Sequence, residues 1–111
     1  MTVLVDSDIL IEVLRGRDEG ILARWMELGE SGDFILCSPV SVAELWHGAR
    51  PREHQALENL FRALICLPID AETGRQAELG DALIAAAVLQ QNAALWTRNR
   101  KHYPMRRVEF Y

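Results

Sequence analysis

Acid, hydroxyl and acid follow one another near the N-terminus, at Asp6, Ser7 and Asp8. They come directly after a short apolar run at 3–5 and before a helical pattern of apolar residues that Gly16 can end. This order predicts a buried strand that leads into a helix, with Asp6 at the turn. Ligands of open parallel α/β sheets bind outside the carboxyl ends of the strands, so Asp6 occupies a position suited to chemistry.

Two further carboxylates lack a basic partner one helical turn away. Glu44 and Asp81 have only Val, Gly or Ala four positions to either side. Both lie on or beside the helix face that would turn toward a sheet, where an isolated carboxylate is normally paired, protonated or bound to a metal. Asn99 follows a predicted strand in the same way as Asp6 and adds a fourth oxygen-bearing side chain.

Asp6, Glu44, Asp81 and Asn99 could together form a site made only of oxygen ligands. Hard cations such as Mg²⁺ or Mn²⁺ prefer these ligands, and no Cys/His spacing of a zinc site competes. A metal held in this way supports hydrolysis of a phosphodiester, because it activates water and stabilises the departing oxygen. Taken singly, Asp6 could instead be a helix cap, and Glu44 could be one surface acid among the chain's 16 Asp and Glu residues.

The elements that must position these residues alternate along the chain. The length of 111 residues predicts one domain over 1–111. Apolar runs predict strands at 3–5, 34–37, 66–69, 95–97 and 108–110, and amphipathic patterns predict helices between them, at 9–15, 19–31, 39–48, 51–65, 71–78 and 79–91. Strands that alternate with helices are typical of a mostly parallel α/β sheet.

The charge of the chain does not indicate a nucleic-acid binder, because the net charge is −4. The basic residues are unevenly placed, however, and five of them fall within ten positions, namely Arg98, Arg100, Lys101, Arg106 and Arg107. An acidic total is compatible with RNA binding when the basic residues gather on one face and a metal neutralises the acids. The alternative is that this cluster is only a solvated face.

The sequence predicts a cytoplasmic protein. Cys37 and Cys66 each adjoin an apolar run, which favours buried, reduced thiols over a disulfide or a metal pair. No segment resembles a signal peptide, and the apolar run at 82–89 is far shorter than the ~20 residues that a membrane helix needs.

Four strings carry a resemblance to a known family: VDSDIL, SVAELWHGA, LGDALIAAAVL and LWTRNRKHY, in this order. The chain resembles the PIN-domain ribonucleases, and more narrowly the VapC-type toxins of toxin–antitoxin pairs. The resemblance implies a PIN-like, three-layer α/β/α fold with a central, mostly parallel sheet of about five strands. It also implies that Asp6, Glu44 and Asp81 hold the metal, and that Asn99 completes the catalytic set at a position where the family carries aspartate or asparagine.

The activity implied by this resemblance is that of an endoribonuclease toxin that depends on Mg²⁺ or Mn²⁺ and cleaves RNA. The implied partners are a second copy of the chain, in a homodimer, and a small cognate antitoxin whose tail covers the active site. Under this interpretation two further groups of residues have supporting roles. Ser7, Asp8 and Thr97 support the carboxylates, whereas Arg98, Arg100 and Lys101 bind the RNA backbone.

The chain departs from the family in two places. A neutral Asn99 implies that the site holds one metal ion firmly and a second only with substrate. The join between Glu78 and Leu79 is shorter than in the family, either because a loop is deleted there or because one is missing from the printed chain. We favour the second alternative.

Two other functions fit parts of the sequence. Asp6-x-Asp8 after a strand also opens the haloacid dehalogenase-type phosphatases, in which the first aspartate is the nucleophile and the second a general acid. That family also needs a lysine and a downstream acid pair, but the only lysine is Lys101 and no acid pair follows Asp81. The other function is a non-catalytic α/β binding module in which the acids are structural.

Overall fold

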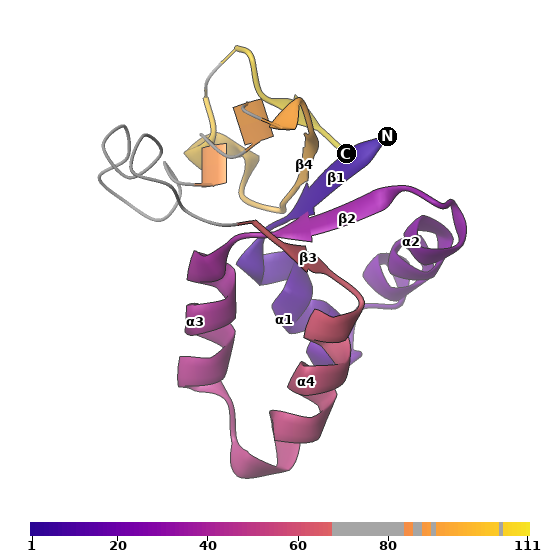
Figure 1. Cartoon of the computed structure of the whole chain (residues 1–111), viewed down its shortest axis with the longest axis vertical. Helices are drawn as coiled ribbons and strands as arrows, with labels where there is room; N and C mark the ends of the chain where they lie inside the picture. Colours follow the sequence, from indigo (N-terminus) through magenta and orange to yellow (C-terminus); the bar gives the residue numbers. More distant parts are fainter. Residues whose placement is uncertain (68–83, 86–87, 90, 105) are drawn as a thin grey trace.

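The computed structural model describes residues 1–67, 84–85, 88–89, 91–104 and 106–111. Within these residues, five strands form one sheet in the order β3-β2-β1-β4-β5 (Figure 1), and every neighbouring pair is parallel. The strands are β1 (Thr2–Val5), β2 (Phe34–Cys37), β3 (Ile65–Cys66), β4 (Ala94–Trp96) and β5 (Glu109–Phe110). The predicted parallel sheet of about five strands is confirmed.

Helices connect the strands, and two of them begin at capping residues that the sequence predicts. They are α1 (Ser7–Arg15), α2 (Glu19–Glu30), α3 (Pro39–Gly48) and α4 (His54–Arg62), with 3₁₀ turns η1 (Pro51–Glu53) and η2 (Arg100–His102). Asp18 Oδ1 accepts the N–H of Ile21 at 3.0 Å, and Ser38 Oγ accepts that of Val40 at 3.1 Å, so both predicted caps form. Gly16 ends α1 with a φ of 67°, a conformation that favours glycine.

Alternating side chains of the strands bury apolar residues on both faces of the sheet. Val3 and Val5 pack into one core with residues of α1, α2 and α4, whereas Leu4 packs into a second core with Ile84 and Val88. Figure 1 shows α1, α3 and α4 together on one side of the sheet. The described residues near 84–91 are helical and cover the other face, which agrees with the predicted three-layer α/β/α fold.

The structure shifts the ends of several predicted elements. The strand expected at 95–97 is Ala94–Trp96, and Thr97 follows it with its hydroxyl bonded to Asp6. The helix expected from Pro51 begins as a 3₁₀ turn, and α4 starts at His54. The helix expected at 71–78, and most of the one expected at 79–91, lie outside the described residues.

The two cysteines differ in exposure, although the sequence predicted that both would be buried. Both are free thiols, but only Cys37 is buried. Cys66 is exposed because β3 forms an edge of the sheet. The prediction of two buried thiols was therefore wrong for Cys66.

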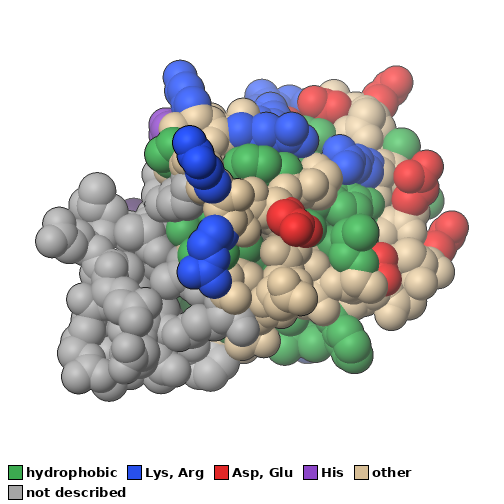
Figure 2. All heavy atoms as spheres, turned by 90° about the horizontal axis from the view of Figure 1, so that it is seen from above, with side chains coloured by type: hydrophobic (Ala, Val, Ile, Leu, Met, Phe, Trp, Pro, Cys, Tyr) green, Lys and Arg blue, Asp and Glu red, His purple; other side chains and the backbone are tan. Residues whose placement is uncertain are grey.

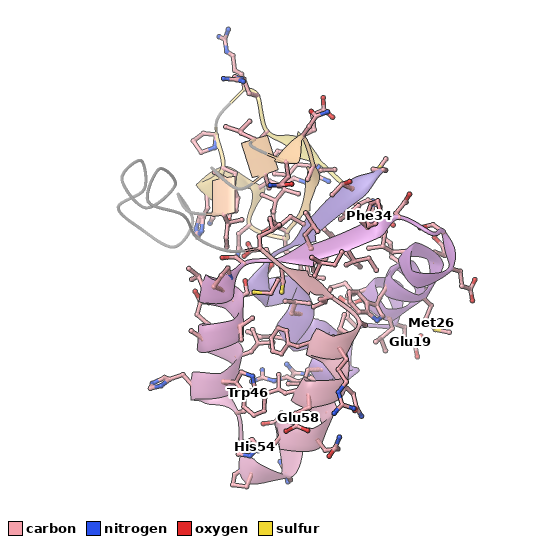
Figure 3. The ribbon with its side chains drawn as sticks, viewed as in Figure 1. Glu19, Met26, Phe34, Trp46, His54 and Glu58 are labelled. Atoms are coloured by element: carbon pink, nitrogen blue, oxygen red, sulfur yellow. The ribbon has the colours of Figure 1, made fainter. Side chains whose placement is uncertain are left out.

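The helix that carries Glu44 is fixed at both ends. At one end Ser41 is fully buried, and at the other Trp46 of α3 contacts His54 of α4, with ring centroids 5.3 Å apart (Figure 3). None of the described helices is both long and apolar enough to cross a membrane.

Candidate active site

The order of the strands places a topological switch point at the carboxyl ends of β1 and β4. The chain runs outward from β1 through β2 to β3, and then continues on the opposite side of β1 with β4 and β5. A reversal of this kind marks the ligand-binding edge of open α/β sheets. Asp6 follows β1 and Thr97 follows β4, and the N–H of Asp6 donates to Trp96 O at 3.0 Å.

Asp6 lies at this switch point, directly after β1, and is only 6% exposed. Its Oδ1 accepts the N–H of Ser7 at 2.7 Å, and its Oδ2 accepts the hydroxyls of Thr97 at 2.9 Å and Tyr103 at 3.1 Å. Burial raises the pKa of Asp6, since removal from water disfavours the charged form. The three hydrogen bonds lower the pKa but do not cancel this effect, and the nearby Asp8 carboxylate raises it further.

The partners of Asp6 are all neutral donors. Within the described part of the chain, no Lys, Arg or His side chain contacts its carboxylate. The carboxylate is therefore held in a fixed orientation while its charge stays uncompensated. An oxygen ligand in this state fits a hard divalent cation.

Asp8 fastens the loop after β4 to the first turn of α1. Its Oδ2 accepts the N–H of Arg98 at 2.9 Å and the side-chain amide of Asn99 at 3.4 Å, and it lies 3.6 Å from Arg98 Nε. Thr97 Oγ1 also lies 3.5 Å from Asp8 Oδ1. The Thr97 hydroxyl thus contacts both Asp6 and Asp8. The backbone N–H of Asn99 donates to the same hydroxyl oxygen at 3.0 Å. The side chain of Asn99 lies against Asp8.

Glu44 lies on α3, which is joined to the start of α1 beside Asp6. The hydroxyl of Ser7 donates to Ser41 Oγ at 2.8 Å, and Glu44 follows Ser41 by almost one helical turn. Ser7 was predicted to support the carboxylates through its hydroxyl; instead only its backbone N–H reaches Asp6. Glu44 itself is exposed and lines a cavity of about 60 Å³ between α1 and α3 together with Arg15.

The structure therefore brings part of the predicted set together. Asp6, Asp8, Thr97 and Asn99 share one hydrogen-bond network. Among the described residues, no three Asp, Glu, His or Cys side chains lie close enough to hold a metal ion. Asp81, the third predicted metal ligand, lies outside the described residues.

The predicted RNA-binding residues differ in how far they are already engaged. Arg98 lies 3.5 Å from Glu12 Oε1 as well as close to Asp8, so its charge is largely paired. Arg100 and Lys101 are exposed. Figure 2 shows Lys and Arg side chains gathered toward one side of the face seen from above, with most acidic side chains toward the other side.

Tyr103 contributes to the site, although sequence reasoning did not single it out. Its side chain is only 2% exposed, and its phenol donates to Asp6 Oδ2. A buried tyrosine usually finds a polar partner for its hydroxyl. The available signal was its place at the end of the string LWTRNRKHY, close behind Asn99.

Known proteins resemble this chain over nearly its whole length. No family model matches it. Ribonuclease VapC10 from Mycobacterium tuberculosis is 34% identical over 118 aligned positions, which cover 93% of this chain and 86% of the relative. The chain belongs to the VapC ribonuclease family.

Solved structures agree with this VapC assignment at the level of the fold. VapBC2 from Rickettsia felis, bound to a DNA fragment from its promoter, has a TM-score of 0.82 and 18% identity, and covers 100% of this chain and 98% of that one. A toxin–antitoxin complex from Klebsiella pneumoniae has a TM-score of 0.78 and 23% identity, and covers 96% of this chain and 95% of that one.

This VapC chain is shorter than its relative within the aligned region. The alignment with VapC10 spans 118 positions, whereas this chain has 111 residues, so VapC10 carries residues that have no counterpart here. The join between Glu78 and Leu79, where the sequence predicted a shortened segment, lies outside the described residues. Both alternatives for that join stay predictions.

Proposed function

We propose that this VapC family member is an endoribonuclease toxin that hydrolyses RNA phosphodiester bonds with a divalent metal ion, Mg²⁺ or Mn²⁺. The observation that carries the proposal is Asp6, a buried carboxylate with only neutral donors at the topological switch point of the sheet. The ribonuclease name of the relative VapC10 supports the same activity. An RNA substrate also favours the expected cytoplasmic location.

Asp6, Glu44 and Asp81 would hold the metal, and Asn99 would add a ligand or a hydrogen bond to the set. A bound Mg²⁺ or Mn²⁺ supplies an activated water and offsets the charge that develops on the phosphoryl oxygens. The described residues contribute the orientation of Asp6. Its Oδ2 already accepts two hydrogen bonds, whereas Oδ1 accepts one and keeps acceptor capacity, so we assign Oδ1 to the metal.

Asp8 and Thr97 act as positioning residues in this proposal. Thr97 holds Asp6 Oδ2, and Asp8 holds the backbone of the loop that carries Asn99 and the basic residues. Arg100 and Lys101 would bind RNA phosphates. Because Arg98 is already paired with Asp8 and Glu12, we expect it to contribute less to RNA binding.

We infer two protein partners, a small cognate antitoxin and a second copy of the chain in a homodimer. The inference is supported by the structural neighbour from Klebsiella pneumoniae, which is a toxin–antitoxin complex. An exposed apolar surface is available for such contacts, since Met26 and Phe34 are each 64% exposed and project from α2 and β2 (Figure 3).

The test is a titration of wild type and Asp6→Asn with Mg²⁺ or Mn²⁺, in which metal binding and cleavage of structured RNA are both measured. Both should disappear in Asp6→Asn and persist in Asp33→Asn, which removes an acid at the N-terminal end of β2. RNA cleavage by the wild type in chelator, at an undiminished rate, would contradict the proposal. If neither the wild type nor the variants bind metal or cleave RNA, the result would favour the non-catalytic binding module.

The phosphatase alternative is disfavoured by the surroundings of Asp8. A general acid must reach the leaving group, but Asp8 accepts hydrogen bonds from the loop backbone and lies beside Arg98. A phosphatase of this type would form a phosphoaspartate at Asp6 with a phosphomonoester substrate. We expect no such adduct in mass spectra of acid-quenched protein.

A further inference from the structure

A cavity of about 320 Å³ lies beside the candidate active site, at the carboxyl ends of β4 and β5 and next to α2. Its lining includes three arginines and two aromatic residues, namely Arg24, Arg98, Arg100, Trp96 and Tyr111. Because ligands bind at this edge of parallel sheets, the position of the cavity suits a substrate.

The lining residues carry an excess of positive charge. Asp18 is the one acid among them, and its Oδ1 already accepts the N–H of Ile21. Arg98 is paired with Asp8 and Glu12, as described above. Within the described ranges, neither Arg24 nor Arg100 forms an ion pair, so two guanidinium charges remain uncompensated.

Aromatic rings hold these two guanidinium groups in place. Arg24 lies 4.1 Å from the centroid of the Tyr111 ring and 5.7 Å from that of Trp96, and Arg100 lies 5.0 Å from that of Phe110. A guanidinium stacked on a ring presents its N–H groups at its edge, where they match the oxygens of a phosphate. The stacked geometry also lowers the conformational entropy that phosphate binding would cost.

We propose that this cavity is a phosphate subsite for the RNA strand, in which Arg24 and Arg100 bind a backbone phosphate that flanks the cleaved one. The inference rests on the proposed ribonuclease function. Continuity with the candidate site supports it, because Thr97 lines the cavity and also donates to Asp6. Arg24 thereby joins the substrate-binding residues from α2, far from the basic cluster in the sequence.

The test measures binding of a single-stranded RNA to proteins that carry Asp6→Asn, so that cleavage does not intervene. Adding Arg24→Gln should weaken binding several-fold and reduce the slope of log K against log salt concentration by about 0.7, the value for one phosphate contact. Arg24→Lys should keep the slope and recover part of the affinity, because lysine retains the charge but not the paired donors. Arg62→Gln, on α4 and outside the cavity lining, is the matched control and should behave as its parent.

The same substitutions in the otherwise wild-type chain separate this inference from the proposed function. Arg24→Gln should lower kcat/KM for RNA by a similar factor while the midpoint of Mn²⁺ binding stays unchanged. Equal RNA affinity and equal salt slope in Arg24→Gln and Arg62→Gln would overturn the subsite, even if the wild type cleaves RNA. Weaker binding of the antitoxin with unchanged RNA affinity would also overturn it, since the cavity would then serve the protein partner.

Discussion

At the scale of single residues, the buried carboxylate of Asp6 destabilises the folded protein but is available to bind a metal ion. Its carboxylate is removed from water, and the Ser7 N–H and the hydroxyls of Thr97 and Tyr103 compensate this only in part, because burial still raises the pKa of Asp6. A buried charge without a cationic partner destabilises the folded state. The same arrangement preserves a ligand that a metal ion can neutralise.

We expect Asp6→Asn to raise the melting temperature of the metal-free protein at pH 7 by about 4 °C, the effect of about 1 kcal/mol on a domain of this size. The pKa of Asp6 is raised by folding, so the wild type loses stability as pH rises from the unfolded pKa through the folded one. The advantage of the variant should therefore shrink on acidification. Thermal unfolding in chelator between pH 4 and 7 tests this, and a lower melting temperature for Asp6→Asn at pH 7 would contradict it.

Tyr103→Phe should weaken Mn²⁺ binding and lower kcat/KM for RNA by about tenfold, because the variant removes a hydrogen bond that orients Asp6. The aromatic ring, and with it the packing in the core, is retained. Tyr111→Phe is the matched control for Mn²⁺ binding, since the Tyr111 phenol makes no hydrogen bond to Asp6. Equal metal affinity in both variants would show that the Tyr103 hydroxyl has no positioning role.

At the scale of elements, the edge strand β3 and the loop after β4 are held in different ways. Cys66 of β3 lies in register with Cys37 of β2, and the loop is held by Asp8 of α1. Burial, together with the neighbouring Cys66, raises the pKa of Cys37 to about 12. Each arrangement leads to a separate prediction.

A thiol-alkylating reagent at pH 8 should modify Cys66 in the native protein and leave Cys37 intact. With a pKa of about 12, only about one Cys37 thiol in 10⁴ is a thiolate at that pH, and the side chain is buried. Mass spectrometry of the labelled protein and of Cys66→Ser makes the measurement. Rapid labelling of Cys37 in the folded Cys66→Ser variant would be inconsistent with its buried position.

Asp8→Ala should release the loop at 98–102 without unfolding the sheet. The variant removes the acceptor for the N–H of Arg98, a charge-assisted hydrogen bond of about 1.5 kcal/mol, so that amide should exchange with solvent about tenfold faster. Glu12→Ala, which removes only the second acid near Arg98, should leave the exchange rate nearly unchanged. Amide hydrogen exchange followed by NMR distinguishes the two variants.

At the scale of the whole molecule, the distribution of charge matters more than its sum. The net charge is −4, yet Arg24 and Arg100 remain unpaired within the part of the chain that the structure describes, and Lys101 is exposed. Cleavage of RNA should therefore become weaker as salt rises. We expect log kcat/KM to fall with log salt concentration with a slope of about −2, because each of three phosphate contacts contributes about 0.7. A slope near zero would exclude phosphate binding by these residues.

The sequence by itself determined the features that depend on neighbouring residues. Apolar periodicity placed the strand before Asp6, and capping side chains located the starts of the helices at Asp18 and Ser38. Such features depend on interactions within a few residues, which a linear pattern records. The position of Asp6 at a strand end, and with it the candidate active-site edge, could therefore be predicted.

Only the tertiary structure decided which distant residues meet. Thr97 bonds Asp6 across 91 positions of sequence, and Tyr103 does so across 97. The stacking of Arg24 on Tyr111 and the exposure of Cys66 also depend on which elements lie side by side. These outcomes depend on the order of strands in the sheet, which places β4 beside β1 and β3 at an edge. Periodicity specifies which face of a strand is buried, but it does not specify which strand lies alongside.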